Sequence, residues 1–376
     1  MRITLFILLG LLLGREASAQ RHYVCYYTPE RLKIDGMGNE AAWQKAAWTE
    51  DYTDIEGDIR PRPTKRTGGS LAESPTLTDS GRGDTFGPEP LAPKFRTRTK
   101  LLWDRENLYI YTELEEPDLW GELLKHDTVI YHDNDFEVFI DPDNDMRNYF
   151  ELEINALGTV MDLFLGKPYR DGGHALLGWD TQGLRSAVHI SGTINRPGDT
   201  DKGWSAEMAI PLASLRLWNE RAMGDSSLVR INFSRVEWDK DVVGGKYVVR
   251  TNPSTGRRLP EHNWVWSPQG IIAMHAPEKW GYLLLSARPV GTDTVAFVLP
   301  AQEKARSFLW EVYYQQQKYR SEHGAYATDL GALGLSSRGG ALELIGTSLQ
   351  YTALLKWDGV GGKLTIDQEG RVANLK

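Results

Sequence analysis

The sequence predicts a mainly β protein: an antiparallel two-sheet β-sandwich of the immunoglobulin-like or jelly-roll type, followed by a small C-terminal α+β appendage. Many short runs alternate between apolar and polar residues and are separated by turn signals, which is typical of a sandwich. After residue 285 the composition changes, and residues 301–323 carry apolar side chains at helical spacing. We therefore expect a sandwich over 20–286, a linker over 287–300 and a helix with a small β-sheet over 301–376.

Composition narrows the class of protein. The chain has 376 residues, a net charge of −8 and a single cysteine. No basic patch with interleaved aromatic residues is present, so nucleic acid is not an expected partner. One cysteine cannot form an intrachain disulfide, and stability must come from a core that a chain of this length can bury.

Residues 1–19 have the pattern of a signal peptide. Arg2 precedes the apolar run at 3–13, and Ala17 and Ala19 form a small-residue cleavage site. The apolar run is too short for a membrane anchor. We expect an exported protein, secreted, periplasmic or at the cell surface, with no membrane span after cleavage.

The first part of the sandwich begins with a strand at 23–27 and a turn plus short helical turn at 34–43 that buries Trp43. Residues 58–94 are rich in Gly, Pro, Ser and Thr and contain few large apolar residues. Such a segment buries too little surface to offset the entropy of ordering, which predicts a disordered insertion. The alternating pattern resumes around a turn at 104–107. Further strands are expected at 160–166, 184–191, 204–210, 229–238 and 280–286.

A hairpin around the turn at 141–145 carries the strongest functional signal. Its two arms alternate, so that one face is apolar: Phe136, Val138, Ile140, Phe150, Leu152 and Ile154. The other face carries carboxylates and an amide, among them Asp135, Glu137, Glu151, Glu153 and Asn155. Polar groups side by side on two strands suit a binding site for a polar ligand.

The tail is expected to be a helix at 301–323 followed by a small meander with strands at 349–355, 363–366 and 371–375. Phe308, Tyr313 and Tyr319 give the helix an aromatic stripe. A three-stranded meander would cover this stripe only in part, so residues 301–376 could dock a carbohydrate-active enzyme or a cell-surface protein. The alternative is that the stripe packs against the meander and the sandwich.

Five stretches in order resemble the family 9 carbohydrate-binding module and its family 9-like relatives. They are 34–43, 101–120, 133–162, 204–215 and 265–285. The resemblance implies a two-sheet sandwich that binds a sugar and has no catalytic role. In sugar-binding members of the family, two tryptophans sandwich a terminal sugar and polar side chains bond its hydroxyl groups.

The resemblance also implies site residues. Glu137 matches the acid that bonds the sugar, and Asn155 matches the amide. Tyr131 and Met274 stand where the two tryptophans are expected, and Glu153 stands near the amide where an arginine is expected. Tyr131 could still stack on a sugar. Other candidates near the cleft are Trp120, Trp179, Trp238, Trp264, His126, His132 and His275, and for these histidines a solvated position in a loop is favoured.

Other motifs indicate little chemistry. Asp141, Asp143 and Asp145 begin like a calcium loop, but Met146 and Leu152 occupy positions where an EF-hand needs glycine and glutamate. An Asp-rich turn is favoured, while a structural calcium ion elsewhere in the sandwich stays open. The sequence shows no HExxH, G-x-S-x-G or phosphate-loop motif. No cofactor is expected.

These observations favour a secreted, non-catalytic carbohydrate-binding protein that supports the degradation or capture of a glycan or polysaccharide. Three alternatives stay open. The chain could be a glycoside hydrolase-associated or hydrolytic protein acting on O-glycosyl compounds, although 287–376 is short for a catalytic domain. It could be a structural or cell-surface interaction protein that has lost the sugar. It could also bind a cofactor such as haem.

Overall fold

The computed structural model of the protein describes residues 20–57, 92–216 and 222–375. The predicted signal peptide at 1–19, and nearly all of the predicted insertion at 58–94, lie outside these residues. Within the described part, no helix combines the length and the apolar character needed to cross a membrane.

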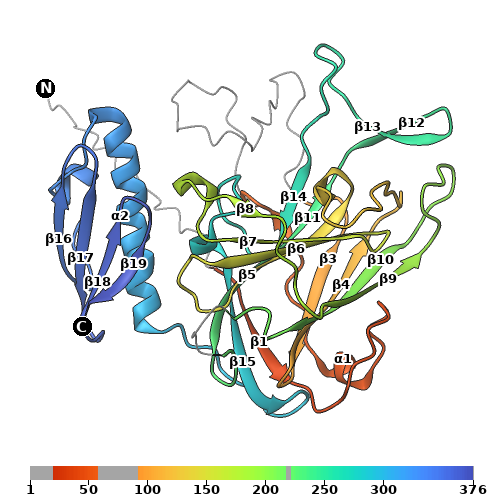
Figure 1. Cartoon of the computed structure of the whole chain (residues 1–376), viewed down its shortest axis with the longest axis horizontal. Helices are drawn as coiled ribbons and strands as arrows, with labels where there is room; N and C mark the ends of the chain where they lie inside the picture. Colours follow the sequence, from red (N-terminus) through yellow and green to blue (C-terminus); the bar gives the residue numbers. More distant parts are fainter. Residues whose placement is uncertain (1–19, 58–91, 217–221, 376) are drawn as a thin grey trace, which may run out of the picture.

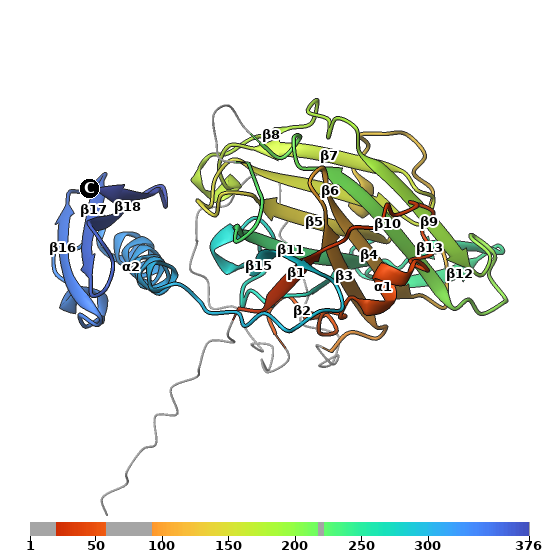
Figure 2. The same cartoon turned by 90° about the horizontal axis from the view of Figure 1, so that it is seen from below.

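The larger part of the molecule is a β-structure folded into two layers (Figures 1 and 2). Its hydrogen-bonded strands follow the order β8-β7-β6-β5-β11-β15-β1-β3-β4-β10-β9, so a continuous path links the two layers. The strands on this path are β1 (His22–Tyr27), β3 (Thr97–Trp103), β4 (Asn107–Glu115), β5 (Asp135–Asp141), β6 (Tyr149–Asn155), β7 (Val160–Leu165), β8 (Ala175–Leu176), β9 (Arg185–Ser191), β10 (Gly203–Pro211), β11 (Leu228–Glu237) and β15 (Gly281–Pro289).

The predicted alternation places the core between the layers. Phe136, Val138 and Ile140 of β5 are fully buried, and they share one apolar cluster with Leu108 and Ile110 of β4 in the other layer. Burial of such side chains is the main favourable term in folding. The mainly β fold is therefore confirmed.

One strand departs from the predicted antiparallel arrangement. β1 pairs in parallel with β15 on one side and with β3 on the other. Alternation along a single strand reports which face is buried but not which partner it has, so the sequence could not show this.

The segment at 34–43 folds as predicted. Trp43 lies in the short helix α1 (Ala41–Lys45) and is fully buried. Its indole Nε1 donates to Glu207 Oε1 at 2.8 Å, and the backbone nitrogens of Asp35 and Gly36 donate to Glu207 Oε2. Gly36 has φ +81°, and a Cβ there would lie 2.6 Å from the backbone nitrogen of His189. Glycine is therefore required at this turn.

Several elements were not predicted from the sequence, because they lack a long run of alternating apolar and polar residues. They are the strands β2 (Thr53–Asp54), β8, β12 (Lys240–Val243), β13 (Lys246–Val249), β14 (His262–Val265) and β16 (Gly340–Gly346), and the 3-10 turns η1 (Ile130–His132), η2 (Tyr169–Asp171), η3 (Pro277–Lys279) and η4 (Gly331–Leu333).

The C-terminal module is helix α2 (Ala301–His323) on a four-stranded antiparallel sheet of β16, β17 (Tyr351–Trp357), β18 (Lys363–Asp367) and β19 (Val372–Leu375), seen at one end of Figure 1. The predicted helix is confirmed, and the meander has one strand more than expected. Gly324, at φ +74°, ends the helix as a left-handed cap.

The module also contacts the sandwich. Arg230 Nη2 of β11 and Glu303 Oε2 of α2 form a buried ion pair at 3.1 Å, and Tyr313 donates to Asp171 Oδ1 at 2.8 Å. Phe308 and Tyr313 are only 2% and 4% exposed, and Tyr319 is partly buried. Phe308 and Tyr313 therefore pack within the molecule, while Tyr319 stays partly exposed, so the aromatic stripe is covered in large part.

Candidate functional site

The β5–β6 hairpin carries its polar residues on the face turned away from the core. In the antiparallel register, Glu137 lies opposite Glu153, and Asp135 lies opposite Asn155. Because side chains alternate along strands, all four project from the same face, together with Glu151. The predicted shared face of Glu137 and Asn155 is thus confirmed. We call Asp135, Glu137, Glu151 and Glu153 the acid face.

The acid face is buried. Its four side chains belong to residues that are 0%, 5%, 4% and 2% exposed, in sequence order. A second apolar cluster covers this side of the sheet, because the turns before β5 and after β7 fold over it: Ile130, Phe139, Tyr149, Met161, Leu163, Leu165 and Trp280, with Tyr169 and Met274 packed against them. Glu137, which the resemblance matches to an acid that bonds a sugar, is therefore covered by the protein's own side chains.

Three oxygen atoms of the acid face have no hydrogen-bond partner: Asp135 Oδ2, Glu137 Oε2 and Glu151 Oε2. The other acid, Glu153, accepts from the backbone nitrogen of Tyr131 through Oε2 at 3.1 Å. Buried polar atoms are nearly always paired, since an unpaired one costs about 1–3 kcal/mol. Several such atoms on one face therefore indicate a place where a ligand could supply the missing bonds.

Burial and mutual repulsion raise the pKa values of these acids. Burial first, and then the charge of Glu153, raises the pKa of Glu137 well above its ordinary range. The pKa of Asp135 rises for the same two kinds of reason, burial first and then the charge of Glu137, and that of Glu153 rises through burial and then the charge of Glu151. Burial followed by Glu137 raises the pKa of Glu151 to about 8. Part of the acid face is therefore protonated at neutral pH, and a protonated carboxyl can donate as well as accept.

No cation balances the acid face in the described part of the chain. His275 Nε2 lies 3.6 Å from Glu151 Oε2, but burial, with a smaller effect of Arg170, lowers the pKa of His275 to about 3. The imidazole is therefore neutral at physiological pH.

The surroundings of His275 differ from what the sequence suggested. Its ring lies 5.6 Å from that of Phe139 and 4.5 Å from that of Tyr169, and Nδ1 lies 3.2 Å from the hydroxyl of Tyr149. This is a packed position, so the expectation of a solvated loop histidine is wrong for His275. His126 and His132 are exposed, as expected.

Met274 lies beside the same aromatic group. Its carbonyl oxygen accepts from Trp280 Nε1 at 2.8 Å, and its sulfur lies 3.1 Å from Gln269 Nε2. Met274 is half-buried and packs on the cluster that covers the acid face. It holds the segment before η3 in place and lacks the flat ring that a stacking partner needs.

Tyr131 is half-buried at the edge of the acid face, in η1. Its backbone is held on both sides: the nitrogen donates to Glu153, and the carbonyl oxygen accepts from Trp238 Nε1 at 2.8 Å. The Tyr131 ring lies beside that of His132 at 4.7 Å. Among the described residues proposed for stacking, Tyr131 combines a fixed backbone with an exposed edge.

Trp120 and Trp238 support this position and do not offer free ring faces. They are 5% and 6% exposed, and pack with Val236, Tyr247 and Val249 in one cluster against which Tyr131 lies. Trp179 is partly buried 4.7 Å from Phe150, and Trp264 is 2% exposed. Burial of most tryptophans is the ordinary outcome for so large an apolar side chain.

Asn155 has all its hydrogen bonds within the protein. Its amide donates to Leu123 O and Asp133 Oδ2, both at 2.9 Å, and its carbonyl oxygen accepts from the nitrogens of Leu157 and Thr159. This uses the full capacity of the side chain. A sugar hydroxyl could reach Asn155 only by replacing one of these bonds, so the contact expected of Asn155 stays a prediction.

Glu151 and Tyr169 were not among the predicted site residues. Glu151 shares the alternation of β6 with Glu153, and this signal was present in the sequence. Tyr169 lies in η2, beyond β7, and only the tertiary fold brings it to His275.

Some of these acids could also hold a metal ion. Ligand atoms of Asp135, Glu137 and Glu153 all lie within 4.8 Å of one another. Asp141, Asp143 and Asp145 form another such group, but Asp141 accepts from the nitrogens of Asn144, Asp145 and Met146. These bonds close the predicted Asp-rich turn.

Comparison with family models identifies a family for this chain. Residues 86–286, just over half of the chain, match the model described as carbohydrate family 9 binding domain-like. The chain belongs to the carbohydrate family 9 binding domain-like family. This family contains binding modules, and the matched region includes the whole acid face and Tyr131.

Several solved structures are similar to this family member, among them the following three. One is a provisionally assigned carbohydrate-binding protein from Bacteroides uniformis ATCC 8492, with 13% identity, 71% of this chain and 100% of that chain covered, and a TM-score of 0.45. The others are structures of a family 9 carbohydrate-binding module from Caldicellulosiruptor kristjanssonii in complex with cellotriose or glucose. Both are 14% identical to this chain, and the match covers 100% of each module. For the cellotriose complex it covers 74% of this chain with a TM-score of 0.39, and for the glucose complex 73% with a TM-score of 0.40. The comparison with curated proteins finds no match.

Proposed function

We propose that the protein binds a carbohydrate at the acid face, with Glu137 and Glu151 bonding hydroxyl groups and Tyr131 stacking on the sugar ring. The observation that carries the proposal is the set of buried carboxylate oxygens without partners, Asp135 Oδ2, Glu137 Oε2 and Glu151 Oε2. A sugar presents many hydroxyl donors in a small volume and an apolar C–H face, which suits acceptors grouped beside an aromatic ring.

The composition of the acid face indicates the class of sugar. Glu153 stands where the family resemblance places an arginine, so the face carries acceptors and negative charge without a cation. A uronate or sulfate group would bring a further anion against buried carboxylates, which is unfavourable in a medium of low dielectric constant. Neutral sugars, and sugars with a free amino group, fit this face better than acidic ones.

Access to the acid face requires a local rearrangement. Two surface cavities, of about 690 and 330 Å³, are lined by other residues, among them Arg31 and Leu184 in the first and His126 and Asp180 in the second. The turn that carries Tyr131 is the element that must move, because it lies at the edge of the face and is bound to it through Glu153. Side-chain and loop adjustments on binding are common.

The wider role proposed for the protein is that of an exported, non-catalytic module that supports the capture or degradation of a glycan. The signal-peptide pattern at 1–19 and membership of a family of binding modules support this role. A carbohydrate-active enzyme or a cell-surface protein is the proposed partner. Because Phe308 and Tyr313 of α2 are buried, such a partner would contact Tyr319 or other surfaces of the C-terminal module.

The test is binding of the purified protein to a panel of neutral, amino and acidic oligosaccharides, followed by calorimetry with the best ligand. We expect binding to neutral or amino sugars and none to uronates. Glu137→Gln and Tyr131→Ala should each weaken binding at least about tenfold, corresponding to about 1.4 kcal/mol. Glu113→Gln, on the other layer, is the matched control and should bind normally. Unchanged affinity in both site variants would place the sugar elsewhere, and no binding to any glycan would favour an interaction protein.

A further inference from the structure

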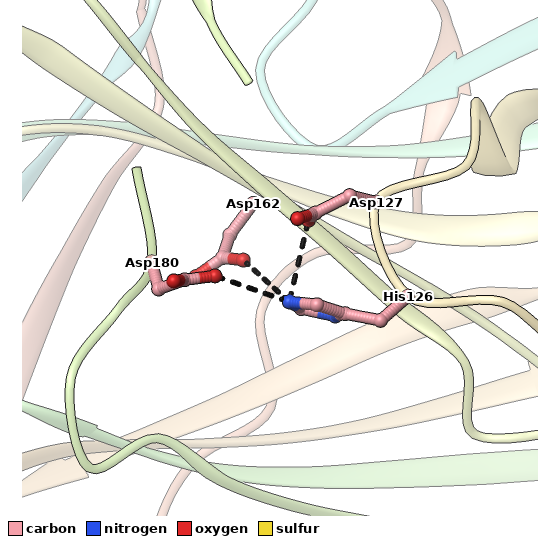
Figure 3. Close-up of side chains that lie close together, drawn as sticks. All are labelled: His126, Asp127, Asp162 and Asp180. Atoms are coloured by element: carbon pink, nitrogen blue, oxygen red, sulfur yellow. Dashed lines mark hydrogen bonds and ion pairs between the residues drawn. The ribbon is translucent and has the colours of Figure 1, made fainter. Parts of the chain in front are cut away.

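Four side chains from three separate segments converge on one point at the edge of the sheet (Figure 3). His126 and Asp127 lie in the loop before η1, Asp162 is on β7, and Asp180 is in the loop between β8 and β9. One ligand atom from each lies within 4.8 Å of all the others. We call this set the His126 cluster: His126, Asp127, Asp162 and Asp180.

The histidine is held in one orientation. His126 Nδ1 lies 2.8 Å from the carbonyl oxygen of Val160, an acceptor only, so Nδ1 carries the proton and donates. In the neutral ring, Nε2 then presents its lone pair to the carboxylates. A backbone carbonyl that fixes the tautomer in this way is a common arrangement behind metal-binding histidines.

The distances from Nε2 fit a metal-ligand polyhedron. The oxygens Asp127 Oδ1, Asp162 Oδ1 and Asp180 Oδ1 lie 3.3, 3.8 and 3.2 Å from His126 Nε2. Ligands of tetrahedral zinc lie about 2.0–2.2 Å from the ion, which places them about 3.3–3.6 Å from one another. The four atoms could therefore surround an ion with little movement.

An independent observation points to a missing partner. Asp162 is 2% exposed, and its Oδ1, which faces the histidine in Figure 3, has no hydrogen bond. Its other oxygen, Oδ2, accepts from the nitrogen of Thr181, and this bond fixes the carboxylate. A protonated imidazole could donate from Nε2 to one oxygen, and Asp180 is the nearest. This single hydrogen bond would leave the buried Asp162 Oδ1 unpaired. A metal ion would contact one oxygen each of Asp127, Asp162 and Asp180.

The surroundings also allow an ion to enter. The His126 cluster opens into the cavity of about 330 Å³, which His126, Asp162, Asp180 and Thr181 help to line. The side chain of Asp180 is half-exposed, so the cluster meets solvent on that side. An entry path is one of the conditions for a working metal site.

We propose that the His126 cluster binds a divalent transition-metal ion such as Zn²⁺ or Mn²⁺. Neutral imidazole is a good ligand for these ions and a poor one for Ca²⁺, which prefers oxygen. Three carboxylates bring three negative charges, and a divalent ion neutralises most of them. The ion would tie the loop that leads to Tyr131 to β7 and to the loop after β8.

The site is separate from the acid face. Asp162 lies opposite Leu152 in the register of β6 and β7, so it projects from the face opposite to that of Glu151 and Glu153. The proposal therefore stands or fails independently of sugar binding.

The test is titration of the metal-stripped protein with ZnCl₂, MnCl₂ and CaCl₂, read by calorimetry, by metal content after dialysis and by the thermal midpoint. We expect one equivalent of Zn²⁺ or Mn²⁺ and a rise in the midpoint. His126→Ala and Asp180→Asn should each weaken this binding at least about tenfold. His174→Ala, an exposed histidine in the neighbouring loop, should leave it unchanged.

Several results would overturn the proposal. They are equal Zn²⁺ affinity in the wild type and both cluster variants, no retained metal in the wild type, or tight Ca²⁺ binding that His126→Ala does not alter. Asp180 is half-exposed, so Asp180→Asn should fold even if another substitution does not, and its circular dichroism spectrum verifies this.

Discussion

Two groups of buried acids lie close together in this protein, and only one of them has cations. Arg235 Nη2 lies 2.8 Å from both Glu116 Oε2 and Glu237 Oε2, and Lys240 Nζ lies 3.4 Å from Glu116 Oε1. All four side chains are nearly inaccessible. The acid face on the adjoining strands β5 and β6 has four acids and no charged partner among the described residues. We call the first group the Arg235 network.

The comparison shows which buried acids are neutralised by cations of the protein and which have hydrogen-bonding atoms left for a ligand. In the Arg235 network, the effect of Lys240 and Arg235 outweighs burial at Glu237 and lowers its pKa, while burial raises the pKa of Glu116 to about 7. On the acid face every carboxyl has a raised pKa. The network is complete without a ligand, and the acid face is not.

The largest expected effect tests the Arg235 network. Arg235→Met should lower the free energy of unfolding by about 3–5 kcal/mol, because it leaves Glu116 and Glu237 buried without the cation that lies closest to both. Arg98→Met removes the half-exposed pair with Glu113 and should cost less than about 1 kcal/mol. Urea unfolding of both variants measures the difference. Similar small losses in both would mean that the network is no more important than a surface pair.

The second prediction concerns ligand binding at the acid face. Glu137→Gln should weaken sugar binding by about 1.5–3 kcal/mol, the typical value of a hydrogen bond to a charged group. The same substitution should raise stability increasingly as the pH rises, since it removes a carboxyl whose charged form is disfavoured by burial and by Glu153. Calorimetry and thermal melting, run on one preparation, measure both effects. A loss of stability at high pH would indicate that the Glu137 carboxylate has a structural role.

The third prediction concerns pH. The pKa of Glu151 is raised to about 8 in the folded protein, above its value of about 4.5 in an unfolded chain. The folded state therefore holds the proton more strongly, and the stability gained from it is complete below about pH 4.5 and is lost as pH rises through 8. One pKa unit corresponds to about 1.4 kcal/mol, so up to about 1.4 kcal/mol of stability should be lost for each pH unit between about 5 and 8.

Melting curves between pH 5 and 9 measure this loss, with Glu151→Gln as the variant that should show a shallower decline. The control is Glu113→Gln, which is partly exposed and should follow the wild type. If Glu151→Gln and the wild type decline in parallel, Glu151 does not titrate in this range.

The smallest expected effect concerns Tyr131. Tyr131→Ala should weaken sugar binding by about 1.4 kcal/mol, or about tenfold, through the loss of stacking. Tyr131→Phe should bind almost as well as the wild type, because the ring is kept and the backbone bonds to Glu153 and Trp238 do not depend on the side chain. Equal binding by all three proteins would exclude stacking at this position.

Parts of the fold and of the candidate site could be predicted from the sequence. Alternation in β5 and β6 gave the core face and the polar face, and helical spacing with Gly324 gave α2. Alternation does not report what covers an outward face. The burial of Glu137 and His275 depends on η1, η2 and the segment before η3, which fold back from distant parts of the chain.

The His126 cluster could not be predicted from the sequence either. His126 and Asp127 are neighbours, but Asp162 and Asp180 are 36 and 54 positions from His126 and follow no metal-binding spacing. Only the packing of the loop after β8 against β7 brings them together. The differences from the family's sugar-binding residues at Tyr131, Met274 and Glu153 were visible in the sequence. Whether other aromatic side chains take the place of the two missing tryptophans could be seen only in the three-dimensional structure.

The parallel pairing of β1 has a consequence for the order in which the protein can assemble during synthesis. His22 pairs with Tyr282, so β1 leaves the ribosome long before its neighbour β15 exists. Until then, β1 has only its short pairing with β3 at Tyr26 and Tyr27, and Tyr23 and Cys25, which are buried in the finished core, lack their partners on β15. Contacts so distant along the chain form slowly. A nascent chain of this kind leaves one edge of β1 unpaired for most of its translation.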